Sequence, residues 1–181
     1  MRRDQLEHLV PAICNLLTPP ETALIAIGSQ SILGSHPDGL PDEVVLSSGL
    51  DIVLPEDPQG KKATVVNGSV GEGSAFHDSS GVYVRCVDVS RGRFPEGWRT
   101  RMVPVCVGDV TAYCLEPHDL LIAKYMEGRE KDRAYCQAVV RADLVKVGIL
   151  LDRLAMADCT EAERIRVRSQ IEQDFRLVAT P

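Results

Sequence analysis

The sequence has no long hydrophobic run. It has 181 residues, 44% of them hydrophobic, but no apolar stretch approaches the roughly 18 residues that a membrane-spanning helix needs. Near the N-terminus, Asp4, Glu7 and His8 interrupt what would otherwise look like the apolar segment of a signal peptide. We therefore expect a soluble protein that has no membrane partner and is located in the cytoplasm.

Clustered metal ligands are also missing. The six cysteines show no Cys-x-x-Cys spacing and the four histidines are scattered, whereas a zinc site needs ligands grouped along the chain. The pattern favours reduced, mostly buried thiols in a cytosolic protein. The cysteines are Cys14, Cys86, Cys106, Cys114, Cys136 and Cys159.

An excess of positive charge is absent as well. The net charge of −6 argues against a broad nucleic-acid-binding surface, because such surfaces are usually basic. The charge is uneven, however: residues 124–181 hold 11 Lys and Arg against 10 Asp and Glu. The sequence is therefore compatible with a local basic surface on the C-terminal helices.

The first 80 residues predict two helices and two strands. Apolar residues between positions 6 and 17 recur at helical spacing, and this helix should end before Pro19. Residues 22–28 and 50–54 are short apolar runs typical of buried strands, the second closed by Pro55. Residues 61–72 favour a short helix.

The second half predicts strands and then only helices. Residues 81–89 and 99–107 alternate β-forming side chains around a Pro-Glu-Gly turn, and residues 110–115 are a third antiparallel candidate. Helices are expected at 117–127, 129–142, 145–157 and 160–177. The fold class is thus α+β: a mixed sheet of about five strands flanked by helices in a core of residues 1–116, with a helical region over 117–181 packed on it.

Two polar features accompany the first two strands. Gly28 and Ser29 follow a buried strand and could offer backbone N–H groups and a hydroxyl to an anion, although Gly-Ser is also an ordinary turn. Asp51 lies in an apolar strand, where an unpaired charge is costly to bury. Asp51 is therefore either a Mg²⁺ ligand or a strand aspartate that meets solvent or an arginine.

A third feature lies in the helical region. Lys124 and Asp132 are eight residues apart, which on one continuous helix means about 80° around the axis and about 12 Å along it. They can converge only if the helix breaks, and Gly128 is the natural stop. A lysine for phosphate and an aspartate for a hydroxyl proton would then face one cleft.

Together these features resemble the nucleotidyltransferase superfamily, and more closely the AbiEii-type and minimal nucleotidyltransferase-like proteins of bacterial toxin–antitoxin and phage-defence systems. The resemblance covers most of residues 22–142. It implies that Gly28, Ser29 and Lys124 bind nucleotide phosphates and that Asp51 holds Mg²⁺. It further implies that Asp51, Lys124 and Asp132 form the catalytic set.

The chain departs from this family at Gly49. The family's strand carries two acids on alternate residues. Aligning Asp51 with the second acid puts Gly49 at the position of the first, and aligning it with the first puts Val53 at the position of the second, so one metal ligand is absent either way. One carboxylate with phosphate oxygens and waters can still hold one Mg²⁺, but a two-metal site is harder to build. Asp88 and His77 are candidate replacements, although a turn charge and a hydrogen-bonded loop histidine would explain them equally.

Two functions follow from the resemblance. The first is a Mg²⁺-dependent transfer of a nucleotidyl group from an NTP to a hydroxyl of an RNA, such as tRNA, or of a partner protein, as part of a toxin–antitoxin system. The second is a catalytically silent member that binds a nucleotide or a partner protein, as an antitoxin-like regulator would. Gly49 favours the second, and the presence of both Lys124 and Asp132 favours the first.

Overall fold

The computed structural model describes residues 1–54 and 56–179, so the predicted strand closure at Pro55 lies outside the described residues. Five strands form one mixed sheet in the order β3-β2-β1-β5-β4. Strand β1 pairs antiparallel with β2 and parallel with β5, so it is the centre of the sheet. The α+β class and the mixed five-stranded sheet are confirmed. The strands are β1 (Ala23–Ile27), β2 (Gly49–Val53), β3 (Tyr83–Cys86), β4 (Val103–Val107) and β5 (Val110–Cys114).

The turn around Pro-Glu-Gly does not join two paired strands, which corrects the sequence-based expectation. β3 and β4 lie at opposite edges of the sheet: β3 pairs parallel with β2, and β4 pairs antiparallel with β5. The chain between them forms two short 3₁₀ helices, η2 (Val89–Arg91) and η3 (Trp98–Arg101). The predicted strand over residues 81–89 is also shorter than expected, because β3 ends at Cys86. The Asp88 carboxylate instead accepts a hydrogen bond from the Ser90 N–H and caps η2.

The predicted helices are present with small shifts of their ends, and two short helices, α2 and α4, were not predicted. The N-terminal helix starts earlier than its apolar pattern indicates and continues through Pro11. The residues after Gly28 form a 3₁₀ helix, η1 (Ser29–Gly34). The α-helices are α1 (Arg3–Asn15), α2 (Asp42–Val45), α3 (Lys61–Val70), α4 (Ala75–Ser80), α5 (Pro117–Glu127), α6 (Glu130–Arg141), α7 (Val147–Ala155) and α8 (Glu161–Ala179).

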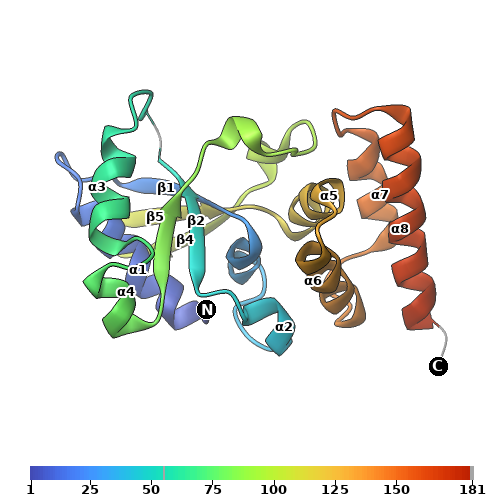
Figure 1. Cartoon of the computed structure of the whole chain (residues 1–181), viewed down its shortest axis with the longest axis horizontal. Helices are drawn as coiled ribbons and strands as arrows, with labels where there is room; N and C mark the ends of the chain where they lie inside the picture. The colour runs from blue at the N-terminus through green and yellow to red at the C-terminus, as the bar shows by residue number, and fades with distance from the viewer. Residues whose placement is uncertain (55, 180–181) are drawn as a thin grey trace.

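Helices cover the two faces of the sheet unequally. Figure 1 shows α1, α3 and α4 on one side of the sheet and α5 to α8 on the other. Side chains alternate along each strand, so Leu50 and Ile52 of β2 lie in the core shared with α1 and α3. Gly49, Asp51 and Val53 consequently face the other way, toward α5 and α6. Asp51 is thus the one charged residue of β2, and it lies on the side of the C-terminal helices.

All six thiols are free, as expected from their spacing. Cys14, Cys114 and Cys136 are buried, while Cys106 is exposed. Burial raises the pKa of the Cys114 thiol to about 12, which keeps it protonated at neutral pH. Among the described residues, no helix is both long and apolar enough to cross a membrane.

A buried carboxylate ties the helical region to the segment before β4. Asp119, on the first turn of α5, has no exposed surface. Its two oxygens accept hydrogen bonds of 2.8 and 3.0 Å from Arg101 of η3, and Arg153 of α7 approaches to 3.2 Å. Two arginines from different elements therefore compensate one desolvated charge, which is the condition under which a buried ion is tolerated.

We expect Asp119→Asn to lower the free energy of unfolding by about 3–5 kcal/mol, because it leaves two partly buried guanidinium groups without their counter-charge. Denaturant unfolding measures the change. The control is Asp152→Asn on the exposed surface of α7, which should change the stability by less than about 0.5 kcal/mol. Equal effects of the two substitutions would contradict a structural role for Asp119.

Candidate functional site

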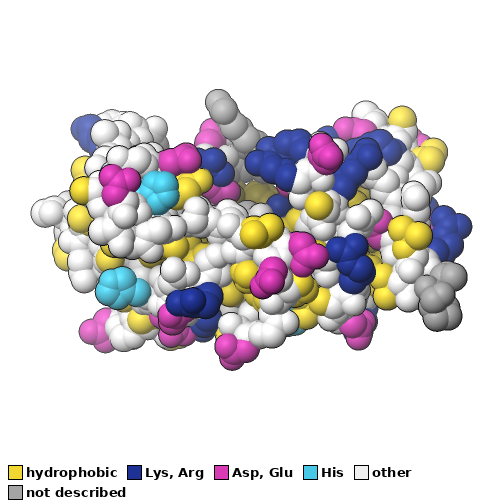
Figure 2. All heavy atoms as spheres, turned by 60° about the horizontal axis from the view of Figure 1, so that its bottom comes forward, with side chains coloured by type: hydrophobic (Ala, Val, Ile, Leu, Met, Phe, Trp, Pro, Cys, Tyr) yellow, Lys and Arg dark blue, Asp and Glu magenta, His cyan; other side chains and the backbone are white. Residues whose placement is uncertain are grey.

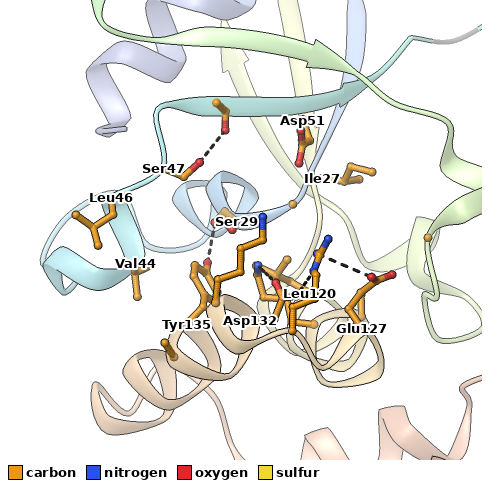
Figure 3. A pocket seen from close by; sticks show the side chains of 18 of the residues that line it. Ile27, Ser29, Val44, Leu46, Ser47, Asp51, Leu120, Glu127, Asp132 and Tyr135 are labelled. Atoms are coloured by element: carbon orange, nitrogen blue, oxygen red, sulfur yellow. Dashed lines mark hydrogen bonds and ion pairs between the residues drawn. The ribbon is translucent and has the colours of Figure 1, made fainter. Parts of the chain in front are cut away.

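A cavity of about 560 Å³ lies between the sheet and helices α5 and α6. All five residues predicted to form a site line it, although they are spread over more than 100 residues of sequence: Gly28, Ser29, Asp51, Lys124 and Asp132. Gly49 also lines it. Figure 3 shows Asp51 and Ser29 on the sheet side and Asp132 and Tyr135 on the helical side. The structure therefore brings the predicted residues together, while their chemical roles stay predictions.

Gly28 makes room for the Asp51 carboxylate. Its φ is +72° and its ψ is −169°, a backbone conformation essentially restricted to glycine. A Cβ atom at this position would lie 2.6 Å from Asp51 Oδ2. Gly28 directly follows β1, whose last residue, Ile27, is the register partner of Asp51. The turn therefore lies beside the middle of β2. The turn and the carboxylate are thus in direct contact, which spacing along the chain does not reveal.

Asp51 is paired with an arginine. Arg85 is its register partner on β3, and both Nε and Nη2 of Arg85 lie 2.8 Å from Asp51 Oδ1. The Asp51 side chain is 23% exposed and that of Arg85 is 57% exposed. Among the described residues, no hydrogen bond reaches Asp51 Oδ2. Asp51 thus has the arginine partner that one interpretation of the sequence allowed, and its role as a Mg²⁺ ligand stays a prediction.

An aromatic ring occupies the space beside Gly49. Gly49 and Tyr83 are register partners, and a Cβ on Gly49 would lie 2.6 Å from Cζ of the Tyr83 ring and 2.8 Å from its hydroxyl oxygen. A larger side chain at position 49 cannot enter without displacing that ring. β3 therefore contacts β2 at both Gly49 and Asp51, through Tyr83 at the first and Arg85 at the second.

Lys124 and Asp132 are joined across a helix break, as predicted. α5 ends at Glu127 and Gly128 adopts a left-handed conformation with φ of +66°. Lys124 Nζ then lies 3.2 Å from Asp132 Oδ1, and Arg129 Nε lies 2.6 Å from Asp132 Oδ2. Both carboxylate oxygens are engaged, and the Asp132 side chain is only 1% exposed.

The protonation of Asp132 is set by these neighbours. Burial alone would raise the pKa of the carboxyl, but the hydrogen bond from Arg129 and the charge of Lys124 outweigh it and hold that pKa below its ordinary value. Asp132 is therefore an anion at neutral pH. A carboxylate with a depressed pKa and two cationic partners is a poor proton acceptor.

Tyr135 connects the two walls of the cavity, and sequence reasoning missed it. Its hydroxyl donates a 2.7 Å hydrogen bond to the backbone oxygen of Ser29, while Lys124 Nζ lies 4.2 Å from the centre of its ring. The signal that could have found it is its spacing, three residues after Asp132 on the same face of α6. Arg85 and Tyr83 were missed because their partners lie 34 residues away in sequence.

The two candidate replacement ligands lie elsewhere. Asp88 caps η2 and does not line the cavity. The backbone N–H of Gly73 donates to Nδ1 of His77, and the His77 ring packs edge-on against Tyr83 at 4.8 Å between centroids. Both residues therefore have structural roles, which agrees with the alternatives that the sequence left open.

The residues of the cavity do not fit a protein-built magnesium centre. Within residues 1–54 and 56–179, no three His, Cys, Asp or Glu side chains are grouped as a metal site would require. Asp51 is the one acid that β2 offers, and an arginine already neutralises it. Mg²⁺ favours several carboxylate and phosphate oxygens. The side chains of the cavity do not supply enough of them to hold a resident metal ion.

Basic side chains nevertheless outnumber acidic ones around the cavity. Figure 2 shows Lys and Arg side chains gathered where the sheet and the helical region meet. The acidic lining residues are Glu43, Asp51, Glu127 and Asp132. The basic ones are Arg85, Arg93, Lys124, Arg129 and Lys131. Three of the four acids are paired with these bases, and Arg93 is paired with Glu163 of α8, so the lining carries a small excess of positive charge.

The packing of Tyr83 against Gly49 predicts a coupling between the two positions. Gly49→Ala should cost about 1–3 kcal/mol of unfolding free energy, because the new methyl group overlaps the ring. Tyr83→Ala alone should also destabilise, through the loss of ring contacts. The double substitution should cost less than the sum of the two, by more than about 0.5 kcal/mol in a double-mutant cycle. Additive effects would show that the ring moves aside freely.

The ion pairs of Asp132 predict a pH-dependent contribution to stability. Asp132→Asn should cost roughly 3 kcal/mol at pH 7, since it leaves Lys124 without its buried partner. The folded-state pKa of Asp132 is depressed, so this stabilisation is present above the ordinary value of 3.8 and is lost as the pH falls through the lower, folded-state pKa. Unfolding curves of both proteins should therefore converge in acid. The control is Glu130→Gln on the exposed side of the same helix, for which no such convergence is expected.

Comparison with known proteins agrees with the geometry. A family model described as a nucleotidyltransferase of unknown function (DUF6036) matches residues 5–176. No curated protein and no solved structure matches the chain. The family model spans both the sheet and the helical region, and hence both walls of the cavity. The chain therefore belongs to this family of nucleotidyltransferases of unknown function.

Proposed function

We propose that the protein binds a nucleoside triphosphate in the cavity and transfers its nucleotidyl group to a hydroxyl of an RNA or of a partner protein. One observation carries the proposal. The five residues that the resemblance assigns to a site, from Gly28 to Asp132, line a single cavity of about 560 Å³, which is within the usual size range of small-molecule sites. The family match supports nucleotidyl transfer as the type of reaction.

The sheet side of the cavity would hold the phosphates. Gly28 leaves the backbone of the turn uncovered by a side chain, and the hydroxyl of Ser29 makes no hydrogen bond to a described residue. Tyr135 holds the Ser29 carbonyl from the other wall, so the turn is fixed before a ligand arrives. A pre-positioned set of donors avoids reorganisation during the reaction.

Lys124 would neutralise charge that develops on the phosphates. Its side chain is only 11% exposed, and both the Asp132 carboxylate and the Tyr135 ring hold its ammonium group. In a site shielded from water, one positioned cation stabilises a phosphoryl transition state more than it would in solution. Asp132 would act as a positioning residue for Lys124 rather than as the base, because both of its oxygens are already engaged.

A second candidate function is nucleotide binding without transfer. The specific observation that favours it is the Tyr83 ring in the space beside Gly49, together with the Arg85 pair on Asp51. The AbiEii-type resemblance connects the first candidate with a toxin–antitoxin pair. In that role, an RNA such as tRNA or a partner protein would be the acceptor. Dependence on Mg²⁺ stays a prediction of that resemblance.

The two candidates are separated by one experiment. The protein is incubated with each of the four NTPs labelled at the α-phosphate, with and without Mg²⁺, in the presence of total RNA and of a protein extract. Transfer predicts labelled RNA or protein, reduced at least about 100-fold in Lys124→Ala, which removes a cation from the transferring phosphate. The control is Lys146→Ala, an exposed lysine outside the cavity with the same charge change.

Thermal unfolding supplies the second measurement. A nucleotide that binds only the folded state stabilises it by roughly 2.7 kcal/mol at a hundred times its dissociation constant. A melting shift with no labelled product would select binding without transfer. Neither a shift nor a product with any of the four nucleotides would reject both candidates.

A further inference from the structure

The family resemblance implies divalent cations held by a pair of strand acids, and β2 of this chain differs from that pattern in two ways. Position 49 lacks a carboxylate and its space holds the Tyr83 ring, while the remaining acid, Asp51, is paired with Arg85. Both changes come from β3, from residues two apart on the same face of the strand. A permanent positive charge thus stands where the family resemblance implies a metal ion.

Arg85 has the donors that phosphate recognition needs. A guanidinium group carries five N–H donors in a planar fork. Two of its nitrogens approach Asp51 Oδ1, each through one N–H, so three donors remain for a ligand. Its side chain is 57% exposed and lines the cavity. Arginine binds phosphate oxygens in a bidentate manner and keeps its charge at any physiological pH.

The opposite wall supplies further cations. Arg129 and Lys124 are both held by Asp132. The pKa of Arg129 is raised first by its hydrogen bond to Asp132, and the more distant charge of Asp51 contributes to the shift. Arg129 and Asp51 both line the cavity. A polyanion placed between the two walls would meet fixed positive charges from β3, α5 and α6.

We propose that Arg85 takes the place of the divalent cation, so that the cavity binds a triphosphate as the free anion rather than as its Mg²⁺ complex. The proposal rests on the nucleotide binding proposed above and adds which group neutralises the charge of the triphosphate. Asp51 then orients the guanidinium of Arg85, and Gly28 gives the carboxylate the space to do so. Removal of Arg85 should release Asp51 as a metal ligand.

The first arm of the test uses metal alone. Binding of Mn²⁺ is measured by electron paramagnetic resonance on the wild type, on Arg85→Ala, and on Arg85→Ala combined with Asp51→Asn. We expect Arg85→Ala to bind Mn²⁺ at least about tenfold more tightly than the wild type, because a carboxylate is freed. The double variant should lose this gain. A wild type that binds Mn²⁺ as tightly as Arg85→Ala would overturn the proposal.

The second arm uses anions with and without metal. Calorimetry measures the binding of tripolyphosphate and of each NTP to the wild type, in EDTA and in excess Mg²⁺. We expect affinity in EDTA to be at least as high as in Mg²⁺, and to fall about tenfold or more in Arg85→Ala, since a charge-assisted bidentate contact is lost. Arg168→Ala, an exposed arginine of α8 outside the cavity, is the control for net charge.

The outcomes distinguish this proposal from the proposed function. Nucleotide binding that requires Mg²⁺ in the wild type would overturn the role of Arg85 and leave nucleotide binding intact. Binding of tripolyphosphate in EDTA without binding of any nucleotide would reject the proposed function and support the anion site. Absence of binding by every anion in both buffers would overturn both.

Discussion

The ion pair between Lys124 and Asp132 is the interaction on which the cavity depends. It closes the angle between α5 and α6 at the Gly128 break, with 3.2 Å between the two charged groups. With this angle, the Tyr135 hydroxyl reaches the backbone oxygen of Ser29. The hydrogen bond between them connects the helical region to the turn after β1. If α5 continued straight through Gly128, Asp132 would lie about 12 Å farther along the axis and the cavity would have no second wall.

The order of the strands in the sheet forms the other wall of the cavity. β1 lies between β2 and β5, antiparallel to the first and parallel to the second. Its C-terminal end therefore meets both the middle of β2, where Asp51 lies, and the end of β5, where the chain enters α5 after two residues. The same sheet centre thus positions the turn, the carboxylate and the start of the helix that carries Lys124. A short connection leaves these three features little freedom to move relative to one another.

Local patterns predicted a large part of this structure. Helical spacing located the four C-terminal helices, and Gly128 marked the end of α5, because helix formation and termination depend on residues within one or two turns. Apolar runs located β1 and β2 for the same reason. The site residues followed from motifs that lie on these elements. What they do chemically is not visible in the fold itself.

The remainder depends on contacts between distant parts of the chain. The pairing of β3 with β2 brings Arg85 to Asp51 and Tyr83 to Gly49, and register of this kind is set by the packing of the whole sheet rather than by local preference. The same holds for the separation of β3 and β4 to opposite edges. A glycine inside a strand does signal a close approach by another group, but it does not say which group approaches.

The Tyr83 ring in the space at Gly49 has a consequence for how this chain can change over generations. An acid introduced at position 49 alone meets the ring at 2.6 Å from its first side-chain atom, and a smaller residue at position 83 alone opens a void beside a glycine. Each single step toward an acid at position 49 is therefore disfavoured by folding before any activity is gained. An acid at position 49 needs a second substitution, at position 83 on the neighbouring strand.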